Sequence, residues 1–593
     1  MCGINGLARL HPEAPPLDRE ELVRTREAMA ARGPDAAGAW LSADGRVALA
    51  SRRLAILDLS AAGTQPMASP DGRWHLVMNG EIYNFRALRR ELEADGVPFR
   101  SQSDTEVVLA LLARKGPAAL SRLRGMFGLA LWDDAEKRLL LARDPLGIKP
   151  LYWTAEGGIL RFASQVKALE AGGAVSRAVD PAGLAGFLLW GAVPEPWTIR
   201  RAVHALPAGC FLVAADGRAG DPVPYHRLDQ APAGPPLDPL DPISAVEDAV
   251  VAHLESDVPV AVFLSAGLDS GLIAALARRH LPTPPTTFTL TFDALAGTAE
   301  DEGPLAAAVA RALGTRHVER RVGPADFAGL WPLALAAMDQ PSIDGFNTFV
   351  VSKAAHEAGL KVVLSGLGGD ELFGSYPSFR DVPALERTAR RLGRLPGLPA
   401  LWPHLARLAP GRPKLPGLLR HGRSRAGAYV LRRGLFLPEE LPALLGRETA
   451  EEGLRACDPV AAAAGVLGAP GDPWRDVHRL ETALYMRNQL LRDSDWASMA
   501  WSVELRVPLV DAWLHHHLAA ADFAPARSRG KAELVRQAAP ELPAALFSRP
   551  KSGFYIPVLE SLAPETARLR PGVRSRRLAL RVLDEMGIWP AAR

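Results

Sequence analysis

The chain has 593 residues, 48% of them hydrophobic, so it is long enough for several domains with large cores. Its three cysteines argue against a disulfide-stapled secreted scaffold, and none of them belongs to the C-x-x-C pair of a zinc or redox site. The 69 Lys and Arg nearly balance the 66 Asp and Glu, so we expect no nucleic-acid partner. The sequence has neither a run of about 18 apolar residues nor a signal-peptide pattern, so we expect a cytoplasmic protein without a membrane partner.

The first two hundred or so residues mix short strands with a few helices. Apolar runs at 47–50 and 74–78 are typical of strands, whereas 85–94 and 105–114 have helical spacing. Residues 127–142 read as a hairpin that turns at its two aspartates. This part of the chain is therefore predicted to be an α+β domain.

A segment rich in Pro, Gly and Asp at 215–242 is typical of a linker, which predicts domains at 1–214 and 243–593. After it, uninterrupted apolar runs at 258–264 and 360–364 alternate with helical segments. Such strands indicate a parallel sheet covered on both faces, so the second domain is predicted to be doubly wound α/β with helical additions.

Arg, Leu and Pro dominate residues 381–425. A basic nucleic-acid arm and a solvated helical insertion both fit this composition, but the Arg residues lie among Leu at helical intervals. We therefore predict a helical insertion, with an interaction surface left open and no role assigned.

Cys2 follows the initiator methionine, so removal of Met1 would leave a thiol and a free α-amine on one residue. An α-amine has a pKa of about 7.7–8.0, so it can take the thiol proton in place of a histidine. Position alone fits an ordinary small residue equally well, and only the downstream segments favour a nucleophile. The other cysteines, Cys210 and Cys457, are predicted to be structural.

Five segments follow Cys2, and most of them mix charged residues with Gly or Asn as binding loops do. Together with residues 1–4 they resemble the glutaminase domain of the asparagine synthetase family, an N-terminal-nucleophile amidotransferase with an α-β-β-α sandwich fold. The segments are 32–35 (RGPD), 51–58 (SRRLAILD), 78–84 (MNGEIYN), 103–106 (SDTE) and 141–152 (LARDPLGIKPLY).

The resemblance implies a role for single residues, although each alone would fit a surface ion network. The thiolate of Cys2 would attack the side-chain amide of glutamine, and Asn79 with the backbone N–H of Gly80 would form the oxyanion hole. Glutamine itself would be bound by Arg53 at its α-carboxylate, by Glu81 and Asp104 at its α-ammonium, and by Asn79.

Residues 263–271 (FLSAGLDSG) lie between an apolar strand and a helix, where unpaired N–H groups can bind an anion. The missing Gly-Lys-Ser/Thr ending excludes a Walker A loop. The segment resembles the pyrophosphate-binding loop of ATP pyrophosphatases, with Ala266 in place of a Gly, which is acceptable if Ala266 has a negative φ. ATP would be bound by Leu264, Ser265, Gly267, Asp269, Ser270, Leu290, Ser365 and Gly366.

Three later segments, 364–376, 493–511 and 549–554, also resemble the asparagine synthetase pattern. By this resemblance Asp269 and Asp370 would be ligands of Mg²⁺, which prefers one or two carboxylates together with phosphate oxygens. Lys551 would be catalytic and neutralise charge on the α-phosphate or the leaving pyrophosphate. The implied cofactors are therefore ATP and Mg²⁺, and a homodimer is one expectation because family members often form one.

The implied reaction hydrolyses glutamine, adenylates a carboxylate with ATP, and forms an amide with release of AMP and pyrophosphate. An internal channel would keep ammonia from becoming ammonium. Leu367 stands where the family commonly has Glu, so Asp495 or Glu504 is expected to substitute as a base, unless no base is needed.

Residues 338–348 also differ from the stretch associated with aspartate recognition. Aspartate is nevertheless the first acceptor implied. A sugar acid or natural-product intermediate is the alternative, and a non-catalytic, partner-binding relative is the third reading.

Overall fold

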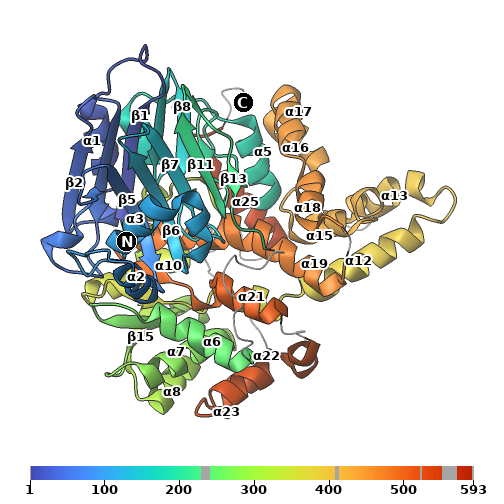
Figure 1. Cartoon of the computed structure of the whole chain (residues 1–593). Helices are drawn as coiled ribbons and strands as arrows, with labels where there is room; N and C mark the ends of the chain where they lie inside the picture. Colours follow the sequence, from blue (N-terminus) through green and yellow to red (C-terminus); the bar gives the residue numbers. More distant parts are fainter. Residues whose placement is uncertain are drawn as a thin grey trace.

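The computed structural model describes residues 2–228, 241–407, 413–469, 471–520, 524–549 and 571–589. Figure 1 shows a β-rich part formed by the start of the chain beside a mainly helical part formed by the remainder. Within the described residues, no helix has the length and apolar character needed to cross a membrane. Lys551, predicted to be catalytic, lies outside the described residues.

Two antiparallel sheets face each other in the β-rich part. In spatial order the first holds β10 (His204–Ala205), β8 (Tyr152–Glu156), β9 (Ile159–Ala163), β1 (Cys2–Arg9), β3 (Val47–Arg53) and β2 (Ala36–Leu41). The second holds β12 (Arg218–Ala219), β11 (Cys210–Ala215), β7 (Arg138–Arg143), β6 (Gly125–Asp133), β5 (Trp74–Ile82) and β4 (Met67–Ala68), with β13 (Val223–Pro224) paired to β11. Apolar residues of both sheets, including Ile4, Val77 and Leu141, fill the space between them.

Helices cover the outer faces of both sheets. The first sheet packs against α1 (Arg19–Glu27) and α4 (Val166–Gly172), and the second against α2 (Phe85–Ala94) and α3 (Asp104–Lys115). Helix α2 buries Phe85, Leu88 and Leu92, whose spacing places them on one face. This arrangement confirms the predicted α-β-β-α sandwich. Because β12 and β13 extend the second sheet, its strands continue past residue 214.

The second part is built around a five-stranded parallel sheet in the order β16 (Arg316–Val322), β15 (Thr286–Phe292), β14 (Val260–Phe263), β17 (Val362–Leu364) and β18 (Glu504–Arg506). Val260 and Val262 pack toward α6 (Pro242–His253), α7 (Leu268–His280) and α8 (Gly303–Leu313). Ala261 between them packs toward α9 (Pro324–Ala337), α10 (Phe346–Glu357) and α20 (Arg492–Met499). Both faces are thus covered, which confirms the doubly wound α/β prediction and explains the uninterrupted apolar strands.

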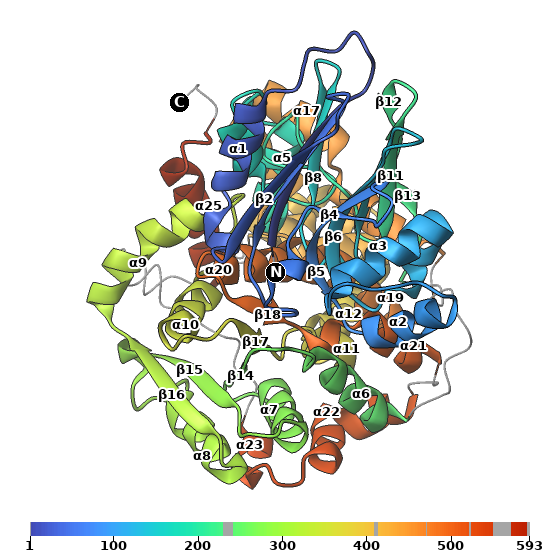
Figure 2. The same ribbon diagram turned by 60° about the vertical axis from the view of Figure 1, so that its left-hand side comes forward.

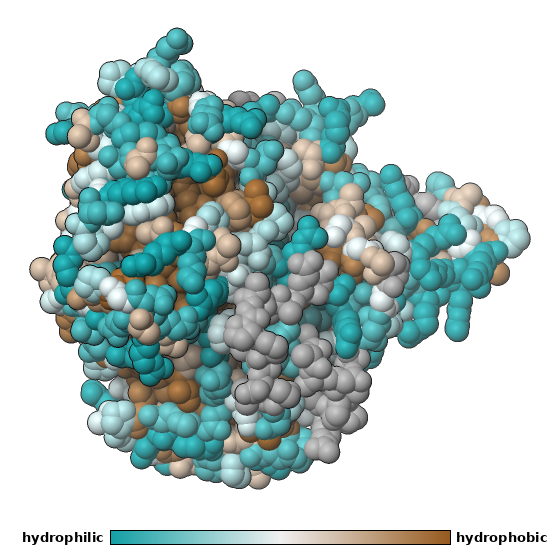
Figure 3. Space-filling model, in the orientation of Figure 1, coloured by the Kyte–Doolittle hydropathy of each residue, from teal (hydrophilic) through white to brown (hydrophobic). Residues whose placement is uncertain are grey.

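Further helices pack on both parts, and the first of them, α5, belongs to the first part of the chain. They are α5 (Pro181–Trp190), α11 (Gly369–Phe373), α12 (Ser378–Leu392), α13 (Leu398–Arg407), α14 (Leu418–His421), α15 (Arg425–Arg433), α16 (Leu441–Leu445), α17 (Arg447–Ala456), α18 (Pro459–Leu467), α19 (Pro473–Leu480), the π-helix η7 (Glu481–Leu491), α21 (Ala512–Ala520), α22 (Ala524–Ala538), α23 (Ala544–Ser548) and α25 (Pro571–Glu585). The described part of the Arg-rich segment 381–425 consists of helices joined by turns, and α12 and α13 project from the body (Figure 1). The surface of this projection is mixed hydrophilic and hydrophobic (Figure 3), with Leu395, Leu401 and Leu405 exposed.

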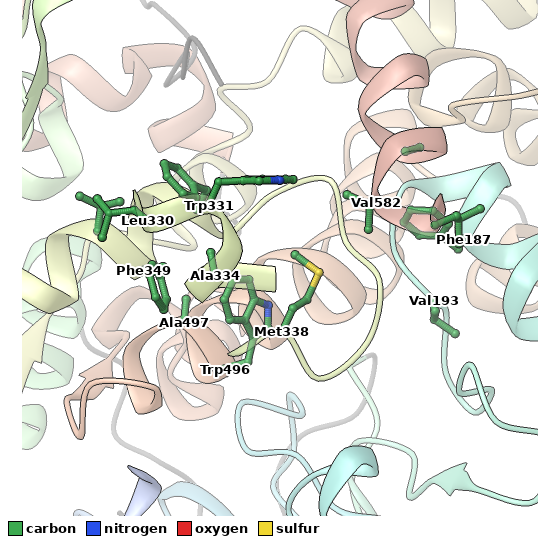
Figure 4. Packing of buried hydrophobic residues seen from close by; sticks show 14 of the residues in the cluster. Phe187, Val193, Leu330, Trp331, Ala334, Met338, Phe349, Trp496, Ala497 and Val582 are labelled. Carbon is green, nitrogen blue, oxygen red and sulfur yellow. The ribbon is translucent and has the colours of Figure 1, made fainter. Parts of the chain in front are cut away.

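The two parts share one apolar core. Phe187 and Val193, which belong to the first part of the chain, lie in the same cluster as Trp331, Phe349 and Trp496 of the second (Figure 4). Figure 2 shows the parallel sheet beneath the two antiparallel sheets, with β18 near the start of the chain. This packing fixes the two parts relative to each other.

Candidate active sites

Cys2 begins β1 and lies opposite Arg53 of β3 in the strand register. Its backbone N–H donates to Oδ1 of Asn79 on β5 over 3.1 Å. Burial raises the pKa of the Cys2 thiol, and the nearby Arg53 charge acts in the opposite direction. The structure thus brings the predicted nucleophile and two predicted partners together from three strands.

The side-chain amide of Asn79 has an unpaired hydrogen-bond donor. Asn79 is completely buried, and its Nδ2 has no hydrogen-bond partner among the described residues. A buried unpaired donor costs free energy, so its presence next to Cys2 favours a ligand oxygen at this position. At neighbouring Gly80 a Cβ would lie only 2.0 Å from the carbonyl oxygen of Met126, which explains why glycine is needed there.

The guanidinium of Arg53 is held by carbonyl groups and not by a carboxylate. It donates to the carbonyl oxygens of Leu57 at 3.1 Å, Asp58 at 2.5 Å and Ser60 at 3.0 Å. No ion pair joins Arg53 to an acidic side chain within the described part of the chain. Carbonyl groups orient the guanidinium without neutralising it, so its charge can bind an incoming carboxylate.

Two buried carboxylates, Glu81 and Asp104, lie near one another, and the charge of Glu81 acts on Cys2. Burial raises the pKa of Glu81 well above its usual range, and neighbouring acidic groups, Asp104 among them, add to the shift. Burial also raises the pKa of Asp104, which accepts a hydrogen bond from the N–H of Ile82 at 2.9 Å. A cationic ligand placed between the two carboxylates would relieve their repulsion, as the α-ammonium of glutamine would.

Residues of the second part complete this site. Arg506 of β18 is fully buried, and its Nη2 lies 3.9 Å from Oε2 of Glu81. Arg506 also donates to Glu504 at 2.5 Å and to the carbonyl oxygens of His253 at 2.8 Å and Glu255 at 2.6 Å. The pattern of segment 493–511 predicts no role for Arg506, because Glu81, His253 and Glu255 lie far away in the chain.

A second buried ion pair joins the two parts. Arg32 donates to both carboxylate oxygens of Asp495, at 2.7 and 3.0 Å, and also to the carbonyl oxygen of Cys2 at 3.3 Å. Lys149 Nζ lies 3.7 Å from the same carboxylate. The backbone of the candidate nucleophile is therefore linked through Arg32 to helix α20.

All eight residues predicted to bind ATP line one cavity of about 310 Å³. The hydroxyl oxygen of Ser270 accepts a hydrogen bond from the backbone N–H of Ser265 at 3.1 Å, and Gly267 precedes the first turn of α7. Ala266 is not among the residues with positive φ, so the substitution noted in the loop is tolerated. The cavity lies at the carboxyl ends of β14, β15 and β17, where open parallel sheets bind ligands.

The two predicted Mg²⁺ ligands, Asp269 and Asp370, lie in the first turns of α7 and α11. Lys531 contacts Oδ2 of Asp269 and donates to Oδ1 of Asp370 at 2.9 Å, so a single ammonium joins both carboxylates. At Gly369 a Cβ would lie 2.2 Å from Asp269 Oδ1, and glycine permits this close approach. Sequence reasoning missed Lys531, for which only its Gly-Lys context offered a signal.

The expectation of a substitute base at Asp495 or Glu504 is wrong. Leu367 lines the ATP cavity, but neither carboxylate does, because each is buried in the contact between the two parts. Asp495 is paired with Arg32 and Glu504 with Arg506. A carboxylate held by a buried arginine is stabilised as the anion and is poorly suited to exchange protons in the cavity.

Comparisons with known proteins agree over most of the chain. A family model described as a glutamine amidotransferase domain matches residues 1–225, and one described as asparagine synthase matches residues 243–582. Asparagine synthetase 1 (glutamine-hydrolysing) of Bacillus subtilis strain 168 is 31% identical over 95% of this chain and 88% of its own length. Asparagine synthetase B of Escherichia coli K12 is 34% identical over 66% of this chain and 68% of its own.

Other similar proteins have different names. The amidase chry2 of Gibberella zeae is 31% identical over 64% of this chain and 60% of its own length. Among solved structures, a glutamine phosphoribosylpyrophosphate amidotransferase of Bacillus subtilis covers 44% of this chain and 60% of that chain, at 18% identity and a TM-score of 0.29.

Proposed function

The chain belongs to the asparagine synthase family, and we propose that it transfers ammonia from glutamine to a carboxylate that it first activates with ATP. The products would be an amide, glutamate, AMP and pyrophosphate. The observation that carries the proposal is that Asn79 presents a buried, unpaired amide donor beside Cys2 in a chain that also forms the ATP cavity.

The first half-reaction would take place at Cys2. Arg53 would bind the α-carboxylate of glutamine while Glu81 and Asp104 bind its ammonium, which positions the side-chain amide at the thiol. Attack of the thiolate creates an oxyanion, and Asn79 Nδ2 is available to stabilise it. Ammonia then leaves, and water releases glutamate from the thioester.

The second half-reaction would take place in the ATP cavity. The N-terminal end of α7 and the hydroxyl of Ser265 would bind phosphate oxygens. Asp269 and Asp370 fit Mg²⁺, because two carboxylates already share one cation and phosphate oxygens would supply further ligands. When bound, Mg²⁺ would neutralise charge on the triphosphate, and we assign the same task to Lys551 and Lys531.

Apolar side chains from both parts lie between the two sites. Tyr83, Met126 and Ile148 of the first part pack with Met486 and Val507 of the second, and Leu367 of the ATP cavity packs against this cluster. An apolar environment favours neutral ammonia over ammonium, because burial disfavours the charged form of an amine. We propose that ammonia reaches the cavity along this contact.

Pyrophosphate release tests the proposal. Purified protein given glutamine, Mg²⁺-ATP and a carboxylate acceptor should form equal amounts of AMP and pyrophosphate. A Cys2→Ala variant should keep this activity only with ammonium chloride, whereas Cys457→Ala, which alters another buried cysteine, should keep both nitrogen sources. No pyrophosphate release with any acceptor, in a protein that still hydrolyses glutamine, would refute the ligase function.

A further inference from the structure

The wall of the ATP cavity contains no basic side chain among the described residues that form it. Beyond the residues assigned to ATP, its polar members are Glu302, Asp344, Asn347, Thr348, Asp493 and Ser494. Its apolar members there include Val351, Leu367 and Leu490. Beyond the residues assigned to ATP, the cavity wall therefore combines acidic and apolar side chains.

Two acidic residues of the wall, Asp344 and Asp493, form no ion pair within the described residues, although the charge of Arg492 acts on Asp493. Asp493 accepts hydrogen bonds from the hydroxyl of Ser342 at 2.6 Å and from the indole N–H of Trp496 at 2.9 Å. Asp344 accepts one from the N–H of Gly345 at 2.8 Å. Burial, together with the nearby Asp344 charge, raises the pKa of Asp493 to about 7. These donors are neutral, and Asp493 adds its negative charge to that of Asp344 as the pH rises above about 7.

Nearby basic residues contact other groups. Arg549 lies 3.4 Å from Glu302 of the wall and donates to the carbonyl oxygen of Ala299 at 3.2 Å. Arg492 precedes Asp493 but donates to the carbonyl oxygen of Val193 in the first part. Lys531 joins Asp269 to Asp370 at the phosphate end of the cavity. None of these side chains lines the cavity, so its described wall offers no basic partner for a second carboxylate of the acceptor.

This wall discriminates between acceptors by charge. Aspartate carries a second carboxylate, which would be brought beside Asp344 and Asp493 with its water removed. Two like charges about 4 Å apart repel by about 1 kcal/mol even in water and by more in a protein interior. An ammonium or hydroxyl group at the same place would instead donate to these carboxylates.

On the basis of the proposed function, we infer that the acceptor is a monocarboxylate whose remaining polar groups are hydrogen-bond donors, and that aspartate is not the preferred substrate. Its donors would bind Asp344 and Asp493, while its apolar part would contact Leu367 and Leu490. The reacting carboxylate is the only anionic group that such a molecule brings to the cavity.

β-Alanine and aspartate form a matched pair for the test, because they differ only in the α-carboxylate. Glucuronate supplies hydroxyl donors in place of an amine. With the full chain, glutamine and Mg²⁺-ATP, we expect kcat/KM for pyrophosphate release with β-alanine or glucuronate to exceed that with aspartate at least about tenfold. An equal or higher value for aspartate would overturn the inference while leaving the proposed function intact.

A charge-removing variant provides a second readout. Asp344→Asn keeps the size and polarity of the side chain but removes its charge, so it should raise the ratio of aspartate to β-alanine turnover at least about fivefold. A ratio is unaffected by partial loss of folded protein. An unchanged ratio would show that Asp344 does not select the acceptor and would overturn the inference. Absence of release with all three acceptors, with glutaminase activity intact, would instead count against the proposed function.

Discussion

At the residue scale, Asn79 has two roles through the two ends of one amide. Its oxygen accepts from the N–H of Cys2, which fixes the side-chain orientation, and its Nδ2 is thereby left as a buried donor. An amide is needed for both roles, because a carboxylate in its place would present only acceptors. The motif at residues 78–84 indicated Asn79, but only the fold shows that its oxygen is bound to Cys2 and that its nitrogen is the unpaired end.

We predict that Asn79→Ala lowers kcat for glutamine hydrolysis by about 10²–10³-fold, as loss of one oxyanion-hole donor does elsewhere. Pyrophosphate release with ammonium chloride should change little, because that reaction does not use the first site. Steady-state assays with the two nitrogen sources measure both values. Equal losses with both sources would indicate a general defect in the fold.

The raised pKa of Asp493 makes the stability of the folded protein depend on pH. Its pKa is raised to about 7, so the folded state resists ionisation more than the unfolded chain does. The stability of the wild type should therefore fall as pH rises from about 4 toward 7 through this group. In Asp493→Asn the corresponding loss is absent.

Relative to the wild type, Asp493→Asn should therefore gain about 1–3 kcal/mol in unfolding free energy between pH 5 and pH 8. Urea denaturation at the two pH values gives this difference. The same offset between the two proteins at both pH values would contradict the assignment.

At the element scale, local patterns predicted the sheets and the phosphate-binding loop because each depends on neighbouring residues. The apolar runs predicted the strands, and the short Ser- and Gly-containing loop predicted the start of α7. The contacts of Arg32 with Asp495 and of Lys531 with Asp269 depend on elements hundreds of residues apart. Residue spacing carries no information on such pairs, so the proposed base at Asp495 could not be excluded before the fold was known.

The contact between the β-rich part and helix α20 should lose stability when its buried ion pair, Arg32 with Asp495, is broken. Arg32→Ala leaves the carboxylate of Asp495 buried without its bidentate partner, so it should cost about 3–5 kcal/mol in unfolding free energy. Arg447→Ala breaks a solvent-exposed pair with Glu451 and serves as the matched control, with an expected cost below about 1 kcal/mol. Similar costs for both variants in denaturant titrations would show that the Arg32 pair does not stabilise the contact.

At the scale of the whole molecule, the two parts are joined by shared apolar clusters and by buried ion pairs. Arg506 of the synthetase part reaches Glu81 of the glutaminase part, and Leu367 in the ATP cavity packs on side chains from both. The proposed glutamine site would therefore include a group supplied by the other part of the chain. This arrangement fits an enzyme in which one site consumes what the other produces.

The central claim is that nitrogen released at Cys2 is delivered to the acceptor within the same molecule. The most direct measurement supplies glutamine labelled with ¹⁵N in its amide, together with excess unlabelled ammonium chloride, Mg²⁺-ATP and a competent acceptor, and determines ¹⁵N in the product amide by mass spectrometry. The account predicts a product that is mostly labelled in the wild type and unlabelled in Cys2→Ala. A wild-type product whose label is diluted to the level of the bulk ammonia would contradict it.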